Sequence, residues 1–176
     1  MKPSLKVVIV AFIAALASPL ALAATPEASA TAPAQHAAAS PLLGSWSLDT
    51  SRMRMPPGQR PKSVIFTFGN AGGNKWDMRV DIVYAPGNEV HSSGAAALDG
   101  TPSVVKNSPE ADTAAMELPS PDVLVMALLK NGVLVSTRIY AVLPDKHSLV
   151  ETAVYPGKDG VPVMKTNYFI RVHQGG

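Results

Sequence analysis

The chain has 176 residues, of which 47% are hydrophobic, and it contains 16 Pro, 13 Gly and no Cys. This length accommodates one domain of ordinary size, large enough to bury a core without disulfide bonds. The absence of cysteine excludes thiolate nucleophiles, cysteine-ligated zinc or iron–sulfur clusters, and a lipid-modified cysteine.

The first 23 residues have the features of a secretory signal peptide. Lys2 and Lys6 lead into an unbroken apolar run over residues 7–16, and Ala21 and Ala23 fit a signal-peptidase site. We predict cleavage after Ala23 and a periplasmic or secreted mature protein. An uncleaved membrane anchor is the alternative, although the run is shorter than the ~20 residues that a span needs.

Removal of the signal peptide leaves a mature chain without net charge. Lys2 and Lys6 are two of the 15 basic residues, so 13 basic and 13 acidic residues remain. A neutral chain has no net attraction for phosphate backbones or anionic lipid. We therefore expect no nucleic-acid partner and no stable membrane insertion after cleavage.

The composition divides the mature chain into two parts. Residues 24–40 are dominated by Ala, Pro, Thr and Ser and contain no apolar stripe, which predicts a flexible, disordered linker. Residues 41–176 are the predicted folded domain.

Turn signals of Gly, Pro, Asn and Asp recur in this domain between runs rich in Val, Ile, Thr and aromatic residues. Short strands at such spacing are typical of an all-β sandwich or barrel. The predicted strands are residues 44–49, 63–68, 75–84, 89–98, 102–105, 113–118, 123–130, 133–143, 148–155 and 163–173.

Two dipeptides, Asp99-Gly100 and Asn131-Gly132, accept the positive φ angles of tight hairpin turns. Each predicts two antiparallel strands that are neighbours in sequence. A meander of about eight to ten strands closes into an antiparallel up-and-down barrel, which leaves no exposed edge. Residues 108–112 read Ser-Pro-Glu-Ala-Asp, a pattern that also begins helices, so a short helix there is an alternative.

Alternation along the strands indicates which side chains face inward. In residues 75–84, Trp76 and Tyr84 share an apolar face, and charged residues occupy the other. Residues 89–98 carry small side chains on both faces. This predicts either an internal cavity or tight packing at a bulge near Gly94.

Two further strands carry expectations about the outer surface. The seventh predicted strand is apolar on both faces, so it is either covered outside by another element or presents an apolar patch to a protein partner. In the second case, charge substitutions at Leu124 or Leu128 are expected to abolish the association without unfolding the domain. In the last predicted strand, Lys165, Asn167 and Arg171 share a face. We expect that face to lie in solvent.

A short motif, Gly44-Ser45-Trp46, opens the first predicted strand and matches the Gly-x-Trp motif of lipocalins and related calycin barrels. Further landmarks at the hairpins are Gly73-Asn74-Lys75-Trp76, Ala97-Leu98-Asp99-Gly100-Thr101-Pro102, Ala111-Asp112-Thr113, Lys130-Asn131-Gly132 and Pro144-Asp145-Lys146. Over residues 44–173 the chain resembles exported bacterial lipocalin-like (calycin-type) β-barrel domains of uncharacterised function. It differs from lipocalins in lacking their Thr-Asp-Tyr motif, their cysteines and a helix after the last strand.

The resemblance implies a structural motif in which Gly44 opens the first strand and Trp46 packs across one end of the barrel. It also implies a basic side chain laid over the indole. Arg138 and Arg171 are the candidates, because a guanidinium stacks favourably on an indole face.

Patterns for catalysis and metal binding are missing from the sequence. His91 with Glu89, and His147 with Glu151, each lack a third ligand at a usual spacing. No Gly-x-Ser-x-Gly elbow, phosphate-binding loop or dinucleotide fingerprint occurs. Ser92 is adjacent to His91 on a strand and therefore points to the opposite face. We predict no catalytic residues, no metal and no cofactor.

The function favoured by these patterns is non-catalytic binding of a small apolar or amphipathic ligand inside the barrel. The predicted ligand-binding residues are Trp76, Tyr84, Ser92, Ala96 and Tyr140. The alternative is a filled barrel that serves as a protein-interaction or structural module of the cell envelope. A small hydrolase or isomerase is less favoured, and it requires a cavity with convergent ionisable groups.

Overall fold

The structure, a computed structural model, describes residues 37 and 39–172. The predicted signal peptide, residues 1–23, and most of the predicted linker lie outside the described residues. The strands are β1 (Gly44–Leu48), β2 (Ser63–Gly72), β3 (Lys75–Ala85), β4 (Asn88–Ala97), β5 (Ser103–Lys106), β6 (Thr113–Ser120), β7 (Val123–Lys130), β8 (Val133–Val142), β9 (Ser148–Tyr155) and β10 (Val163–Arg171). Three short 3-10 helices, η1 (Thr50–Arg52), η2 (Pro57–Gln59) and η3 (Lys158–Gly160), lie in the connections.

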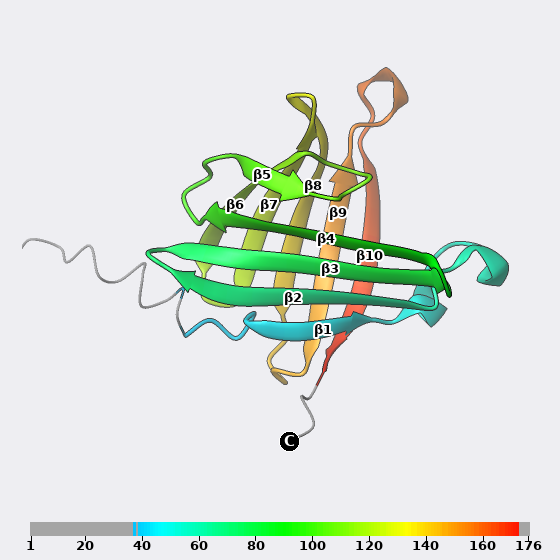
Figure 1. Cartoon of the computed structure of the whole chain (residues 1–176), viewed down its shortest axis with the longest axis horizontal. Coiled ribbons are helices and arrows are strands. Elements are labelled where there is room, and N and C mark those ends of the chain that lie inside the picture. The colour runs from blue at the N-terminus through cyan, green and yellow to red at the C-terminus, as the bar shows by residue number, and fades with distance from the viewer. Residues whose placement is uncertain (1–36, 38, 173–176) are drawn as a thin grey trace, which may run out of the picture.

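The ten strands form one closed antiparallel barrel, in which each strand pairs with its neighbours in sequence and β1 pairs with β10. The predicted all-β up-and-down barrel is therefore confirmed. Figure 1 shows β1 to β4 crossing in front of β7 to β10. Among the described residues, no helix is long and apolar enough to cross a membrane.

The two predicted hairpins differ in tightness. Asn131 and Gly132 have φ angles of 52° and 75°, and they join Lys130 directly to its partner Val133, as the two-residue turn requires. The β4–β5 connection is wider, because Asp99 forms a bridge with a residue of β6 instead of closing a tight turn. The two strands still pair antiparallel.

The alternative of a short helix over residues 108–112 is wrong. The Ser108 hydroxyl accepts hydrogen bonds from the backbone N–H groups of Glu110 and Ala111, as an N-cap would. No helical turn follows, because the Asp112 N–H donates to the carbonyl of Leu129 in β7 and the chain enters β6.

One end of the barrel is closed by two fully buried tryptophans. The Trp46 indole N–H donates to the Leu42 carbonyl at 2.8 Å, and the Trp76 indole N–H donates to the Ala37 carbonyl at 3.1 Å. Ala37 and Ser40 are buried here, although their composition assigned them to the linker. The last residues of that segment therefore pack against the barrel, because they cover the indoles and accept one of their hydrogen bonds.

Two expectations about outward faces are wrong. Leu124 and Leu128 of β7 point into the core, so neither side chain is presented to a partner. In β10, Asn167 pairs with Glu151 of β9, and both side chains face the interior. Cross-strand partners point to the same side of a sheet, so this face lines the barrel at Asn167, whereas Lys165 farther along the same face is exposed as expected.

Candidate functional site

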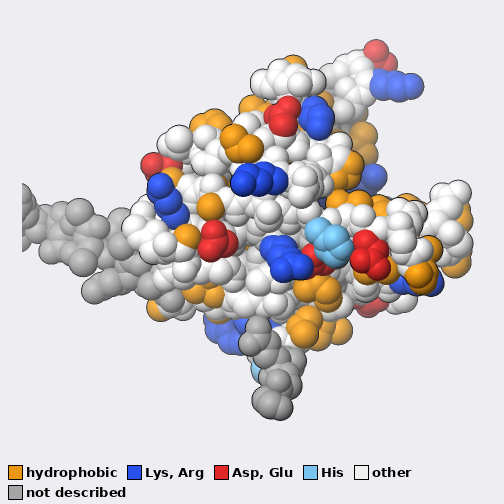
Figure 2. Space-filling view, in the orientation of Figure 1, with side chains coloured by type: hydrophobic (Ala, Val, Ile, Leu, Met, Phe, Trp, Pro, Cys, Tyr) orange, Lys and Arg blue, Asp and Glu red, His pale blue; other side chains and the backbone are white. Residues whose placement is uncertain are grey.

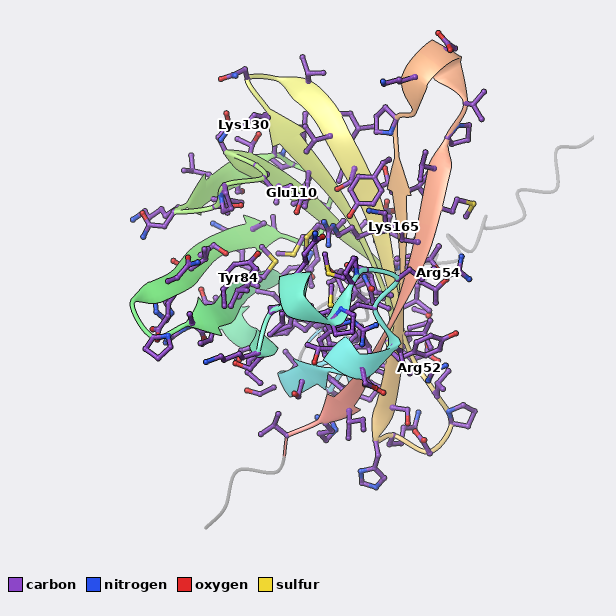
Figure 3. All side chains as sticks on the ribbon, turned by 90° about the vertical axis from the view of Figure 1, so that its right-hand side faces the viewer. Arg52, Arg54, Tyr84, Glu110, Lys130 and Lys165 are labelled. Carbon is purple, nitrogen blue, oxygen red and sulfur yellow. The ribbon has the colours of Figure 1, made fainter. Side chains whose placement is uncertain are left out.

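The barrel encloses a cavity of about 350 Å³ toward the end opposite the tryptophans. Its lining includes Tyr84 at the end of β3 and Glu110 on the β5–β6 loop, and both side chains are more than a third exposed. The cavity therefore reaches the surface between these elements. Figure 3 looks toward this end, with Tyr84, Glu110 and Lys165 at separate points around the rim.

One wall of the cavity is apolar. It is built by inward-facing residues of β2, β3 and β4, namely Phe66, Val80, Ile82 and Val90. The segment between β1 and β2 covers part of the opening and adds Met53 and Met55. Strict alternation in β3 and β4 places these side chains inside, while the charged residues between them stay outside.

The opposite wall contains a charged cluster centred on Arg138 of β8. The Arg138 Nη1 donates to Glu151 Oε1 at 2.9 Å, and its Nη2 donates to Glu110 Oε1 at 2.5 Å. Glu151 is only 1% exposed and Arg138 only 11%. Water therefore screens this ion pair little, and removal of one partner would leave the other charge buried.

Neutral groups complete the hydrogen bonds of this cluster. Asn167 donates its side-chain amide to Glu151 Oε2 at 2.5 Å. The Ser136 hydroxyl donates to Glu110 at 3.3 Å, and Arg138 Nη2 also donates to the Tyr155 hydroxyl at 3.2 Å. The cluster thus spans β8, β9, β10 and the β5–β6 loop.

The acidic groups keep Arg138 charged. Burial disfavours the guanidinium charge, but the charges of Glu151 and Glu110 beside it outweigh burial and raise the pKa of Arg138. Burial also raises the pKa of Tyr155, against the opposing effect of Arg138. The ion pairs thus hold Arg138 between Glu110 and Glu151, and the Tyr155 phenol beside them is protonated at neutral pH.

Tyr140 differs from the other polar groups of this wall. It is 1% exposed, and its hydroxyl makes no hydrogen bond among the described residues. Burial, and then the adjacent Glu151 carboxylate, raise the pKa of Tyr140 well above its usual range. The hydroxyl is therefore protonated and buried beside Glu151 and Arg138, with less than 1 Å² of accessible surface.

The structure separates the five predicted ligand-binding residues into two groups. Tyr84, Ser92 and Tyr140 line the cavity. Trp76 and Ala96 are cross-strand partners near the closed end and do not line it. Alternation indicated that Trp76 and Tyr84 share one face of β3, but it carries no information on the depth of a side chain along the barrel axis.

The basic side chain over Trp46 is Arg171. Its guanidinium lies 4.1 Å from the indole centroid and donates to the carbonyls of Pro41 and Leu43. Gly44 permits this arrangement, because its φ is +110° and an added Cβ would lie 3.0 Å from the Arg171 guanidinium. Arg138, the other candidate, faces the cavity instead.

Sequence reasoning missed Glu110, Glu151 and Asn167. Glu151 carried a usable signal, because it alternates with outward residues on the same face as the buried Leu149 and Ala153. A lone carboxylate on an apolar face requires a partner. Glu110 carried no comparable signal, since its loop reaches Arg138 only through the tertiary fold.

The outer surface over β3 and β4 carries a separate charged group, visible in Figure 2 as a pale blue histidine among red and blue side chains. His91 lies 2.6 Å from Asp81 and 3.3 Å from Glu89. Hydrogen bonds with Asp81, and then Glu89, raise the pKa of His91. Within residues 37 and 39–172, no group of three or more potential ligands could hold a metal ion.

No protein-family model matches this chain, and no curated protein matches it in sequence. What is established is therefore a closed ten-stranded antiparallel barrel with an internal cavity.

Proposed function

We propose that this barrel binds a small apolar or amphipathic molecule in its cavity, in the manner of lipocalin-like proteins. The observation that carries the proposal is the cavity of about 350 Å³. Small-molecule sites have volumes of roughly 300–1,000 Å³ and mainly apolar walls with a few polar groups. Burial of an apolar ligand against Phe66, Ile82 and Val90 would remove apolar surface from water on both partners.

The alternative of a filled barrel acting as an envelope interaction module is supported less well by the structure. The residues assigned to a partner, Leu124 and Leu128, are buried inside the barrel. The interior also contains the cavity. Ligand binding is therefore the better supported proposal.

A small hydrolase or isomerase is the second candidate, and the convergence of Glu110, Arg138, Glu151 and Tyr155 on one cavity favours it. The carboxylates, however, both bind Arg138. Carboxylates held in this way stabilise a cation and are not poised to accept a proton from a substrate. Mass spectrometry of ligands recovered after incubation tests this candidate, since a hydrolase or isomerase alters them and a binder returns them unchanged.

A matched pair of variants on β4 tests the binding proposal. Ser92 is buried and lines the cavity, whereas the adjacent Ser93 is exposed on the outer face. We expect the purified protein to bind naphthalene, an uncharged apolar fluorophore of ten carbon atoms that fits this volume, with a change in its fluorescence. The Ser92→Phe variant should lose this binding because the ring occupies the cavity, while Ser93→Phe should retain it. Equal binding by both variants would place naphthalene on the outer surface and contradict the proposal.

Native mass spectrometry of protein purified without detergent provides a second test. A co-purifying small molecule, absent after denaturation and from Ser92→Phe, is the expected result. The same spectrum tests the proposed export, because cleavage after Ala23 leaves a polypeptide with the mass of residues 24–176. An intact chain from an exporting host would contradict that cleavage.

A further inference from the structure

The charged side chains that line the cavity carry an excess of negative charge. They are Glu110, Arg138 and Glu151, and every other lining residue is apolar or neutral. Both carboxylates form ion pairs with the same guanidinium. Two negative charges and one positive charge leave one negative charge on the wall, so its field favours a cation over an anion.

The hydrogen bonds of the guanidinium work against an anionic ligand. Each of the three Arg138 nitrogens already donates to a group of the protein: Nε to Ser136, Nη1 to Glu151, and Nη2 to Glu110 and Tyr155. The guanidinium is also only 11% exposed. An anionic head group would therefore compete with two carboxylates for a cation that is largely buried behind them.

The two carboxylates differ in what they offer to a ligand. Glu151 is 1% exposed, and its two oxygens accept hydrogen bonds from Arg138 and Asn167. Glu110 is 38% exposed and lies on the β5–β6 loop at the opening. Its Oε1 accepts from Arg138 and Ser136, whereas its Oε2 has no hydrogen bond within the described part of the chain. A cationic head group at the opening can bind Oε2 while Arg138 keeps Oε1.

We infer that the cavity binds a cationic amphiphile, whose ammonium group pairs with the Glu110 carboxylate at the opening while its apolar chain lies against β2, β3 and β4. This inference rests on the proposed ligand-binding function and specifies the class of ligand. A charge-assisted hydrogen bond between ammonium and carboxylate is about twice as strong as a neutral one. Because Glu110 is partly exposed, the ammonium group keeps part of its hydration and avoids the desolvation that a fully buried charge would require.

Basic side chains at the rim do not line the cavity. Figure 3 shows Arg54, Lys130 and Lys165 around the opening, and none of them is among the lining residues. Lys130 interacts with the opposite charge of Asp112, and Arg54 and Lys165 are exposed. Charges in contact with water contribute little to affinity and are screened by salt. They affect the rate at which a cation approaches more than its affinity for the site.

Three octyl compounds separate the charge of the head group from the burial of the chain. At pH 7 octylammonium is a cation, 1-octanol is neutral and octanoate is an anion. None of them has more non-hydrogen atoms than naphthalene, so the cavity of about 350 Å³ accommodates all three. Their affinities for the purified protein are measured by calorimetry at pH 7 and about 0.15 M salt, below the concentrations at which they aggregate.

We expect octylammonium to bind about tenfold more tightly than octanoate, and more tightly than 1-octanol. If 1-octanol binds as tightly as octylammonium, the charge of the head group does not select the ligand and the inference is overturned. Tighter binding of octanoate would also overturn it and indicate that a ligand carboxylate replaces Glu110 on Arg138. Failure of all three compounds, and of naphthalene, to bind would instead refute the proposed function itself.

A glutamate variant tests the contact with the head group. Glu110→Gln should weaken octylammonium binding about three- to tenfold, because the ammonium group loses its counter-charge. It should leave 1-octanol binding unchanged, since the apolar wall is untouched. Unchanged octylammonium binding by this variant would overturn the assignment of Glu110 as the ligand contact.

Glu117→Gln is the matched control, because it makes the same change in net charge at another site. Glu117 is exposed on β6 and does not line the cavity. This variant should bind octylammonium as the parent does. Equal weakening by Glu110→Gln and Glu117→Gln would show that the cation responds to the overall charge of the protein, and it would overturn the inference.

Discussion

The Arg138–Glu151 ion pair offers a quantitative test of the cavity wall. The two side chains are 11% and 1% exposed and are joined by a hydrogen bond of 2.9 Å. Replacement Arg138→Met would leave the Glu151 carboxylate buried, with the Asn167 amide as its remaining hydrogen-bond donor. Breaking a buried pair in this way costs about 3–5 kcal/mol, a large part of the 5–15 kcal/mol by which domains are stable.

The decisive comparison is with the double variant Arg138→Met/Glu151→Gln. Without the carboxylate no buried charge remains at this position, and the amide oxygen of the introduced glutamine would still accept a hydrogen bond from Asn167. We therefore expect the double variant to recover at least half of the stability lost in Arg138→Met. Urea unfolding at pH 7, followed by the fluorescence of the buried Trp46 and Trp76, measures both losses. A single variant that loses less than about 1 kcal/mol, or a double variant no more stable than the single, would refute the reasoning.

Three other positions give independent tests. Gly94→Ala should destabilise the protein by about 1–3 kcal/mol in urea unfolding, because the new Cβ would lie 3.0 Å from the Val104 carbonyl oxygen. An unchanged unfolding midpoint would mean that β5 shifts away from β4 without loss of stability. Trp76→Phe should destabilise the protein by more than about 1 kcal/mol in the same assay, because the buried carbonyl of Ala37 loses its hydrogen-bond donor. Unchanged stability would show that water replaces the indole N–H as the donor. The pKa of the His91 imidazole, measured by NMR, should lie above 6.5 because its acidic neighbours raise it. The stabilisation from His91 is therefore complete below pH 6.5 and is lost as pH rises through the folded-state pKa. The Asp81→Asn variant should lower the pKa of His91, and an unchanged pKa would contradict the hydrogen bond between the two side chains.

Local sequence signals determined the strands because each depends on neighbours along the chain. Gly, Pro, Asn and Asp interrupt extended structure wherever they cluster, so all ten strands fall close to their predicted bounds. Asn131-Gly132 set the pairing of β7 and β8 next to the turn, but a bulge between Leu128 and Leu129 shifts the register by one residue farther along the strands. The small residues of β4 left open a cavity or tight packing near Gly94, and the structure shows both. Ser92 lines the cavity, whereas an added Cβ on Gly94 would lie 3.0 Å from the Val104 carbonyl oxygen.

Local sequence signals could not predict how far along the barrel axis a side chain lies, or which side chains meet across the barrel. Trp76 and Ser92 both face inward, yet one closes the end and the other lines the cavity. Arg138 and Arg171 were both candidates for Trp46, and only the closed sheet shows that Arg171 lies over the indole. Side-chain alternation has a period of two residues and repeats unchanged along a strand. It therefore distinguishes the inner face of the barrel from the outer face, but not one end of the barrel from the other.

The sequence by itself thus determined an all-β chain of ten strands in a meander, because turn chemistry and alternation act over a few residues. Tertiary structure alone decided that Glu110 of a loop and Glu151 of β9 bind Arg138 of β8, and that the Tyr140 hydroxyl lies buried beside them. These groups are distant in sequence and meet only when the barrel closes. The physical reason is that a charge or hydroxyl is satisfied by whatever lies within hydrogen-bond distance, which the order of residues does not specify.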